Sequence, residues 1–229
     1  MQRGRDGAMN HPAAANETES GFEIRHLGLQ DYSVVWNRMR EFTARRNHTT
    51  PDEIWLVEHP PVFTLGTNGK ESHLLNPGYI PVVRSDRGGQ VTYHGPGQLV
   101  AYLLIDLKRR RLGVRALVGA MEQSIIGLLA EYRIKGETLA GAPGVYVAGA
   151  KIAALGLRIR KGCSYHGLSL NVELDLNPFQ HINPCGYQDM EVTSLHDIGV
   201  RISTGEVEPR LLNHLTFNLQ NPESEAAPL

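Results

Sequence analysis

The segment "GVYVAGAKIAALGLRIRKGCSYHGLSLNVEL", residues 144–174, decides the fold class. Apolar and polar residues alternate in three successive stretches of it, 144–149, 151–160 and 164–174, as they do in strands with one buried face. No helical pattern separates the three stretches, whereas a doubly wound parallel sheet would place a helix after each strand. The segment therefore favours a mixed α+β sheet.

The remaining chain adds strands and helices that do not alternate regularly. Further strands are expected at 22–29, 53–59, 62–66, 80–85, 91–94 and 99–107, and helices at 31–46, 114–133 and 206–219. The first helix has Asp31 as its expected N-cap and directs Val34, Val35, Met39 and Phe42 towards the core. We therefore expect an α+β fold with a mixed β-sheet flanked by helices.

A single domain accounts for most of the 229 residues, because no linker or repeat interrupts residues 21–220. Residues 1–20 are small and polar, which is typical of a disordered tail. Residues 221–229 are expected to form a flexible C-terminal tail.

The composition and the absence of common motifs exclude several protein classes. The net charge is -1, so no overall field attracts nucleic acid or a membrane surface. The longest apolar-rich run, 99–107, is far shorter than the roughly 20 residues of a membrane helix, and the N-terminus lacks the apolar core of a signal peptide. The sequence contains no P-loop, no G-x-G-x-x-G after a strand, no G-x-S-x-G and no H-E-x-x-H. We expect a cytoplasmic protein without a metal, a cofactor, or a nucleic-acid or membrane partner.

The stretch "RSDRGGQVTYHGPGQLVAY", residues 84–102, is the densest group of ligand-type residues. Gly88 and Gly89 lack a Cβ, so their N–H groups can face a ligand at contact distance. Arg87 and His94 place polar side chains on either side of this loop. The alternative is a glycine-rich hairpin in which His94 makes a structural hydrogen bond.

The stretch "HINPCGYQDM", residues 181–190, places the thiol of Cys185 on a Pro-Gly turn rather than in an apolar run. A free thiol has a pKa near 8.5, so a nucleophilic cysteine needs a nearby base or cation. His181 and Lys151 are the candidates, and Lys151 begins an otherwise apolar strand. The alternatives are an inert Cys185 and a Lys151 at a surface strand end. Cys163 is expected to be a small buried filler.

Two segments resemble the lipoyl(octanoyl) transferases of the biotin/lipoate ligase fold group. The first is "RGGQVTYHGPGQLVAY" (87–102), and the second is "GAKIAALGLRIRKGCSYHGLSLNVELDLNPFQHINPCGYQDMEVTSL" (149–195). The resemblance extends over roughly residues 22 to 215. It implies a biotin/lipoate protein ligase-like catalytic fold, with residues 21–220 as the octanoyltransferase catalytic domain.

The resemblance also implies an activity. An octanoyl group passes from octanoyl-acyl carrier protein to Cys185 as a thioester, and then to the ε-amino group of a lysine on a lipoyl domain. Lys151 acts as the acid/base and lowers the pKa of the thiol. The acceptors are the lipoyl domains of 2-oxoacid dehydrogenases and the glycine cleavage H protein, and the reaction begins endogenous lipoate synthesis. The enzyme is expected to be a monomer and to need no cofactor.

The acyl-binding segments of the family correspond to three short stretches of this chain. Their residues are Arg87, Gly88, Gly89, Gln90, Val91, Thr92, Tyr93, His94, Ala154, Leu155, Gly156, Gly167, Leu168 and Ser169. Two basic clusters, 108–115 and 158–161, are candidates for steering an acidic carrier protein. The alternative for both clusters is an ordinary solvated turn.

Two other functions remain open. A ligase that activates free lipoate or octanoate as an adenylate usually carries a longer "GGG" segment, whereas residues 87–90 read "RGGQ". A non-catalytic module that binds lipoyl domains or carrier protein should have lost Cys185 or Lys151, and this chain keeps both. The acyltransferase is therefore the favoured function.

Overall fold

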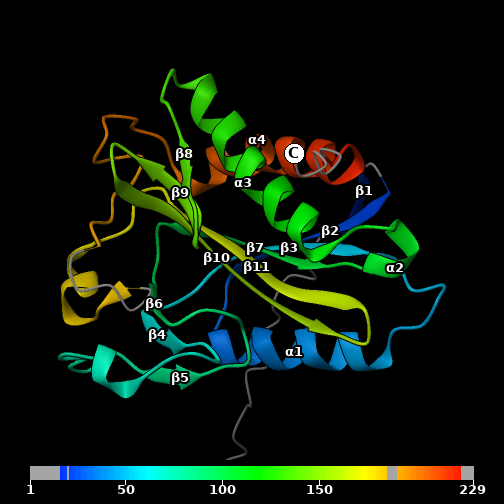
Figure 1. Ribbon diagram of the computed structural model, residues 1–229, viewed down its shortest axis with the longest axis horizontal. Helices are drawn as coiled ribbons and strands as arrows, with labels where there is room; N and C mark the ends of the chain where they lie inside the picture. The colour runs from blue at the N-terminus through cyan, green and yellow to red at the C-terminus, as the bar shows by residue number, and fades with distance from the viewer. Residues whose placement is uncertain (1–15, 20, 185–189, 223–229) are drawn as a thin grey trace, which may run out of the picture.

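The computed structural model describes residues 16–19, 21–184 and 190–222, and an eight-stranded sheet forms its centre (Figure 1). In spatial order the strands are β1 (Asn16–Glu19), β2 (Phe22–Leu29), β3 (Glu53–Glu58), β7 (Gln98–Leu104), β11 (Cys163–Asn171), β10 (Ala150–Arg160), β9 (Ala142–Val147) and β8 (Glu137–Leu139). The pair β2–β3 is parallel, and the other neighbouring pairs are antiparallel. The expected mixed sheet is confirmed.

A smaller sheet packs near one end of the large one. Its spatial order is β5 (Val82–Arg84), β4 (Val62–Leu65), β6 (Val91–His94), with β4 parallel to β5 and antiparallel to β6. The short 3-10 helices η1 (Glu71–His73) and η2 (Asn177–His181) lie in the loops beside it.

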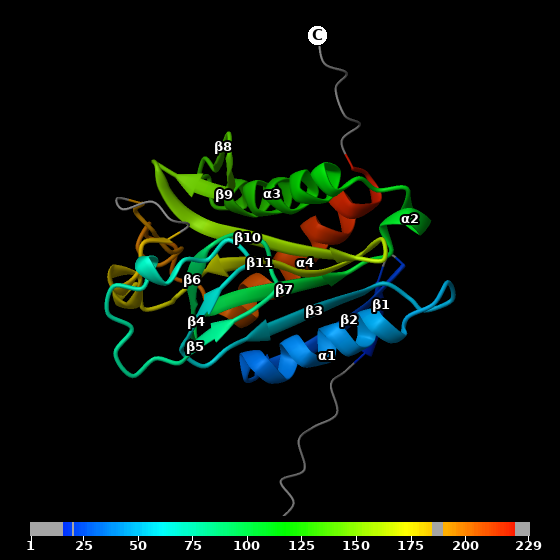
Figure 2. The ribbon, with the colours of Figure 1, turned by 60° about the horizontal axis from the view of Figure 1, so that its bottom comes forward.

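Helices cover both faces of the large sheet, as Figures 1 and 2 show. The helices α3 (Val114–Glu131) and α4 (Thr204–Gln220) lie on one face, and α1 (Tyr32–Arg45) lies on the other. Strand β7 shows how alternation builds both interfaces. Leu99, Ala101 and Leu103 belong to the cluster with α3 and α4, whereas Val100 and Tyr102 belong to the cluster with α1. None of the described helices is long and apolar enough to cross a bilayer.

The start of α1 follows the sequence prediction. The Asp31 carboxylate accepts hydrogen bonds from the N–H groups of Ser33 and Val34, so the N-cap is confirmed. Val35 and Met39 are fully buried, as expected. Val34 is 50% exposed, so its assignment to the core is wrong. It lies about 100° around the helix from Val35, off the stripe that faces the sheet.

Two further expectations need correction. Residues 1–20 are not all a disordered tail, because Asn16–Glu19 form β1 and pair with β2; residues 1–15 and 20 lie outside the described residues. The strand expected at 99–107 ends at Leu104. The Asp106 carboxylate caps the short helix α2 (Leu107–Arg110) by accepting the N–H of Arg109. Of the expected C-terminal tail, residues 223–229 also lie outside the described part of the chain.

Candidate active site

A cavity lies between the α1 face of the large sheet and the smaller sheet. Including its open mouth, it encloses about 500 Å³ of space unoccupied by protein atoms. It is lined by Tyr32, Arg87, Gly89, Gln90, Val91, Thr92, His94, Val100, Tyr102, Ala154, Leu155, Gly156, His166, Gly167, Leu168 and Ser169. Strands β7, β10 and β11 supply one wall, and β6 with the preceding loop supplies the other. Three stretches far apart in the sequence thus meet around one mainly apolar hollow.

The predicted acyl-binding residues gather here with two exceptions, Gly88 and Tyr93. The ring of Tyr93 packs in the separate cluster of the smaller sheet. The N–H of Gly88 donates to the carbonyl oxygen of Leu157 at 2.9 Å, so the expectation that it faces a ligand is wrong. A Cβ on Gly88 would lie 3.0 Å from that same oxygen, so glycine lets the loop approach β10. Gly88 thus anchors the cavity wall to β10.

Arg87 fixes the loop that it belongs to. Its guanidinium donates to the carbonyl oxygens of Thr64 (2.6 Å), Gly88 (2.9 Å) and Gln90 (2.6 Å), and its Nε donates to the Thr64 hydroxyl at 3.0 Å. The side chain is buried and lines the cavity. These bonds fix the shape of the wall around the guanidinium.

His94 lines the cavity, and both of its ring nitrogens are held by hydrogen bonds within the fold. The Gln98 amide nitrogen donates to Tyr93 and Asn171, so its oxygen accepts from His94 Nδ1 at 2.7 Å. His94 Nε2 is then left to accept from the Thr64 hydroxyl at 3.2 Å. Burial lowers the pKa of His94 to about 3. The alternative reading of this residue, a structural hydrogen bond beside a glycine-rich hairpin, therefore describes its contacts.

Asp86 ties three elements together beside the cavity, and the sequence did not single it out. Its carboxylate accepts from Trp36 Nε1 at 2.7 Å and from the Tyr165 hydroxyl, and it contacts His166 Nε2 at 3.0 Å. Burial raises the pKa of Asp86, but these hydrogen bonds outweigh it and hold the pKa well below its usual range. Asp86 thereby joins α1 and β11 to the loop before β6. Within the described ranges, no group of three or more His, Cys, Asp or Glu side chains is arranged to hold a metal ion.

Lys151 is buried at the start of β10, with only 4% of the residue exposed. The alternative of a surface strand end is therefore wrong. Its Nζ contacts the carbonyl oxygen of Pro143 at 3.4 Å and lies 5.1 Å from the centre of the Tyr146 ring. A smaller hollow around Lys151 shares Thr92, Ala154 and Ser169 with the cavity. The amine thus adjoins one end of the cavity.

Cys185 belongs to residues 185–189, which lie outside the described part of the chain. The residues that flank this segment meet Lys151 from both sides. Pro184 lines the hollow around Lys151, while Lys151 donates its backbone N–H to Glu191 (2.8 Å) and accepts from Thr193 (3.0 Å). The chain thereby brings both ends of the Cys185 segment to the lysine.

His181, the other candidate partner of Cys185, and the second cysteine, Cys163, lie in different surroundings. His181 is exposed, and its carbonyl oxygen accepts from the backbone of Leu75 and Asn76. Cys163 is buried at the far end of β11, and burial raises the pKa of its thiol. The prediction that Cys163 is a buried filler is confirmed.

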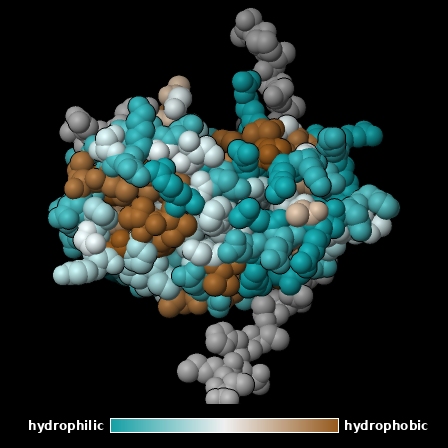
Figure 3. All heavy atoms as spheres, turned by 90° about the horizontal axis from the view of Figure 1, so that it is seen from below, coloured by the Kyte–Doolittle hydropathy of each residue, from teal (hydrophilic) through white to brown (hydrophobic). Residues whose placement is uncertain are grey.

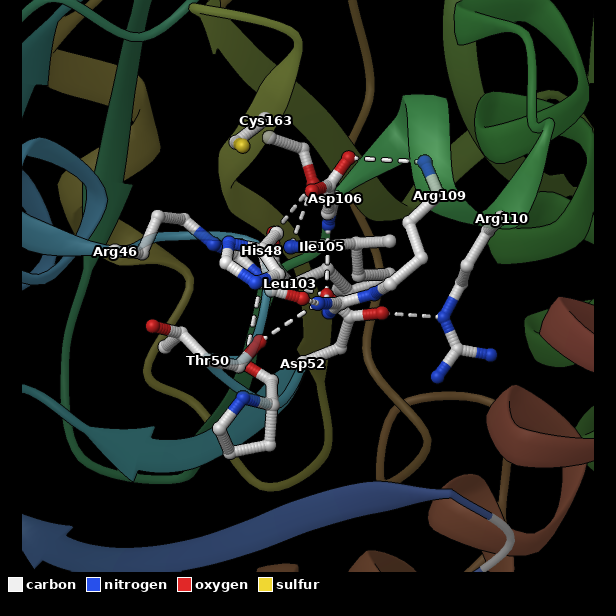
Figure 4. A network of polar contacts seen from close by, with 12 residues as sticks. Arg46, His48, Thr50, Asp52, Leu103, Ile105, Asp106, Arg109, Arg110 and Cys163 are labelled. Carbon is white, nitrogen blue, oxygen red and sulfur yellow. Dashed lines mark hydrogen bonds and ion pairs between the residues drawn. The ribbon is translucent and has the colours of Figure 1, made fainter.

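The two basic clusters meet at the opposite end of the strands from Lys151. Leu107, directly before the 108–115 cluster, donates its backbone N–H to the carbonyl oxygen of Gly162, directly after the 158–161 cluster. Figure 4 shows, however, that Arg109 and Arg110 point to the buried carboxylate of Asp52. Two arginines of the 108–115 cluster are therefore already paired with Asp52, and fewer of its positive charges than the sequence suggests are available to an acidic partner.

The face that carries α1 also has exposed apolar surface. Figure 3 shows a hydrophobic area on its left, the side on which Figure 1 places β4, β5 and β6. Leu75 and Val82, in the segments around the smaller sheet, are 57% and 41% exposed.

The comparison with family models is decisive. Residues 31–216 match the model described as "Lipoyl protein ligase A/B catalytic domain". The chain belongs to the lipoyl protein ligase A/B catalytic family. Among curated members, the octanoyltransferase of Nitrosococcus oceani is 61% identical over 196 residues, covering 86% of this chain and 88% of that protein. The octanoyltransferase of Laribacter hongkongensis is 56% identical over 202 residues, covering 88% of this chain and 98% of that protein.

Solved structures confirm the ligase-like fold expected for this family. A lipoate-protein ligase A bound with ATP superposes with a TM-score of 0.72 at 14% identity, covering 86% of this chain and 84% of that one. A biotin protein ligase from Aquifex aeolicus superposes with a TM-score of 0.53 at 15% identity, covering 86% and 68%. At such low identity the likeness concerns the fold alone.

Proposed function

We propose that this member of the lipoyl protein ligase A/B family is an octanoyltransferase. It moves an octanoyl group from octanoyl-acyl carrier protein to the ε-amino group of a lysine on a lipoyl domain. The observation that carries the activity is the 54–61% identity to octanoyltransferases over most of both chains. The acceptors are the lipoyl domains of 2-oxoacid dehydrogenases and the glycine cleavage H protein.

The cavity supports the choice of a medium-length acyl group. One wall of the cavity runs along β11 from Gly167 to Ser169, which pair with Tyr102 and Val100 of the neighbouring strand β7. The hollow around Lys151 continues this wall to Asn171. The four steps along the strand from Gly167 to Asn171 span about 13 Å. An extended octanoyl chain fits along this length with its carbonyl carbon near Lys151, and its methylene groups leave water for the apolar wall.

Cys185 is the proposed nucleophile for the first half-reaction. Its sulfur attacks the thioester carbonyl carbon, a new C–S bond forms, and the C–S bond to the carrier protein breaks. The thiol proton passes to Lys151 Nζ and from there to the departing carrier thiolate. One thioester replaces another, so the step is nearly thermoneutral and needs no ATP.

The second half-reaction transfers the acyl group to the acceptor amine. The amine attacks the acyl-enzyme carbonyl, an amide bond forms, and the Cys185 sulfur leaves. The proton lost by the amine returns to Cys185 through Lys151. Lys151 suits this role because its amine adjoins one end of the cavity and both flanks of the Cys185 segment reach the lysine.

Intact-protein mass spectrometry tests this proposal. The enzyme is mixed with octanoyl-acyl carrier protein without an acceptor, alongside Cys185→Ser and Lys151→Ala. We expect a mass gain of one octanoyl group that hydroxylamine removes and that Cys185→Ser lacks. Lys151→Ala should acylate on the order of 100-fold more slowly.

Two results would contradict the proposal. An adduct that forms from free octanoate only with ATP would indicate the adenylate-forming ligase. If Cys185→Ser bound both partners and turned over normally, Cys185 would not be the nucleophile.

A further inference from the structure

The backbone of Lys151 is held on both sides, which leaves its side-chain direction to be set by other residues. On one side, its backbone N–H and carbonyl oxygen form hydrogen bonds with Glu191 and Thr193. On the other side, Lys151 pairs with Tyr146 of the neighbouring strand β9. The register of this pair shifts immediately afterwards, between Lys151 and Ala153. A bulge of this kind re-aims the side chain beside it.

Gly144 on β9 forms the surface against which the Lys151 side chain lies. A Cβ on Gly144 would come within 3.1 Å of Lys151 Cε, 3.4 Å of Nζ and 2.6 Å of the Ala153 carbonyl oxygen. Its φ of +142° is also unfavourable for other residues. Any larger residue here would push on the end of the lysine that carries the amine.

Glu122 of helix α3 holds Gly144 in this place. Its carboxylate accepts the N–H of Gly144 at 3.0 Å. Figure 2 shows α3 lying over β9 and β10, and the residues that line the cavity place it on the other face of the sheet, with α1. A helix outside the cavity therefore fixes the strand that supports the amine.

We propose that Gly144 and Glu122 are positioning residues that aim the Lys151 amine at the reacting thioester. This inference rests on the proposed function, because the position of the Lys151 amine affects the reaction only if that amine takes part in acyl transfer. Gly144 supplies the space for Lys151 Cε, and Glu122 keeps β9 at the distance that this space requires.

Gly144→Ala and Gly149→Ala form a matched pair for the first test. Gly149 lies in the turn between β9 and β10 with a φ of +89°, and its Cβ would meet no atom within 4 Å. Both variants place a side chain at a positive φ in the same hairpin, but only Gly144→Ala brings a Cβ against Lys151 Cε and against the Ala153 carbonyl oxygen, so the Lys151 resonance described below separates displacement of the lysine from distortion of the strand pair. We expect kcat/KM to fall on the order of 100-fold in Gly144→Ala and to stay within about two-fold in Gly149→Ala.

Glu122→Ala and Glu122→Gln test the contribution of the helix. Glutamine keeps an oxygen that can accept the Gly144 N–H, so we expect near-normal activity in Glu122→Gln and about ten-fold loss in Glu122→Ala. Glu131→Ala, on the same helix but paired with Arg210 and His214 of α4, is the control and should keep kcat/KM.

A readout independent of turnover is the Cε–Hε resonance of Lys151 in protein labelled at lysine Cε. The sequence has five lysines, so Lys151→Arg assigns the signal. The Tyr146 ring beside the amine makes this resonance sensitive to small displacements. We expect it to move in Gly144→Ala and Glu122→Ala but not in Gly149→Ala.

The outcomes separate this inference from the proposed function. An unchanged Lys151 resonance in Gly144→Ala, or equal loss of activity in Gly144→Ala and Gly149→Ala, overturns the positioning role. Full activity of Lys151→Ala overturns the lysine's role in catalysis instead, and the resonance then still decides whether Gly144 positions the side chain.

Discussion

Removing the charge of Asp52 should destabilise the protein strongly without touching its active site. The Asp52 side chain is 1% exposed and accepts from Arg46 and Arg109, each at 2.6 Å, and from Arg110 and the N–H of Asp106 (Figure 4). The perturbation is Asp52→Asn, which keeps the shape and removes the charge.

The magnitude depends mainly on Arg46, because its side chain is 3% exposed and cannot regain water. Removing one partner of a buried pair costs about 3–5 kcal/mol. Arg109 and Arg110 are 35% and 21% exposed and can turn to solvent, so each adds less than about 1 kcal/mol. We therefore expect Asp52→Asn to lower the free energy of unfolding by about 3 kcal/mol and the Tm by about 10 °C.

The pH dependence follows from the pKa of Asp52. Burial raises this pKa, but the hydrogen bonds from Asp106, Arg110 and Arg46 outweigh burial and hold it below its usual value. The carboxylate's stabilisation is thus complete above the unfolded pKa near 3.9 and is lost as the pH falls through the folded pKa. The difference between wild type and Asp52→Asn should persist from pH 5 to 8 and shrink below about pH 4.

Urea denaturation followed by tryptophan fluorescence measures the effect, with Glu71→Gln as the control. Glu71 pairs with Arg84 on the surface, where both side chains are more than half exposed, so its loss should cost less than about 1 kcal/mol. A loss below about 1 kcal/mol in Asp52→Asn, with an unchanged m-value, would refute the reasoning. Because Asp52 lies at the opposite end of the strands from Lys151, kcat/KM of the folded variant should stay within about two-fold.

Two further predictions concern the cavity wall and its length. Burial lowers the pKa of His59 to about 4 and that of His94 to about 3, below the unfolded value near 6.5. The two neutral histidines therefore make their full contribution to the free energy of unfolding above pH 6.5. Below that pH, the free energy of unfolding should fall by up to about 1.4 kcal/mol per pH unit for each histidine as the pH approaches 4. A urea midpoint that does not change between pH 7 and 5 would contradict this. Ala154 lines both the cavity and the hollow around Lys151, so Ala154→Leu should shorten the acyl channel. We expect kcat/KM for octanoyl donor to fall at least about ten-fold while butanoyl donor is spared, since each methylene contributes about 0.8 kcal/mol; equal loss for both donors would show that the residue does not limit chain length.

Local patterns in the sequence account for the elements and for much of the cavity. Alternation in 144–174 predicts strands with one buried face, and Asp31 predicts the start of α1; the structure buries both faces of β7 and β11. The glycine-rich stretches identify the cavity walls because only small residues allow strands and loops to approach this closely. These signals are readable since each depends on neighbours within a few residues.

The misplaced residues share a different origin. Val34 was assigned to the core from helical periodicity, and the N–H of Gly88 to a ligand from the missing Cβ, but the turn of the helix exposes Val34 and a hydrogen bond to Leu157 occupies the Gly88 N–H. The residues next to Val34 and Gly88 in the sequence do not predict either the exposure of Val34 or the hydrogen bond of Gly88.

The sequence by itself determined the mixed sheet, the resemblance to the family and most residues of the cavity, but not the contributions of Tyr32, Tyr102 and His166. Only the tertiary structure decided which charges are structural and how the lysine is aimed. Asp52 meets Arg110 across 58 residues of chain, and Glu122 meets Gly144 across 22. Such contacts have no periodicity to read, because their energy comes from burial and partner geometry that exist only after the strands and helices have packed.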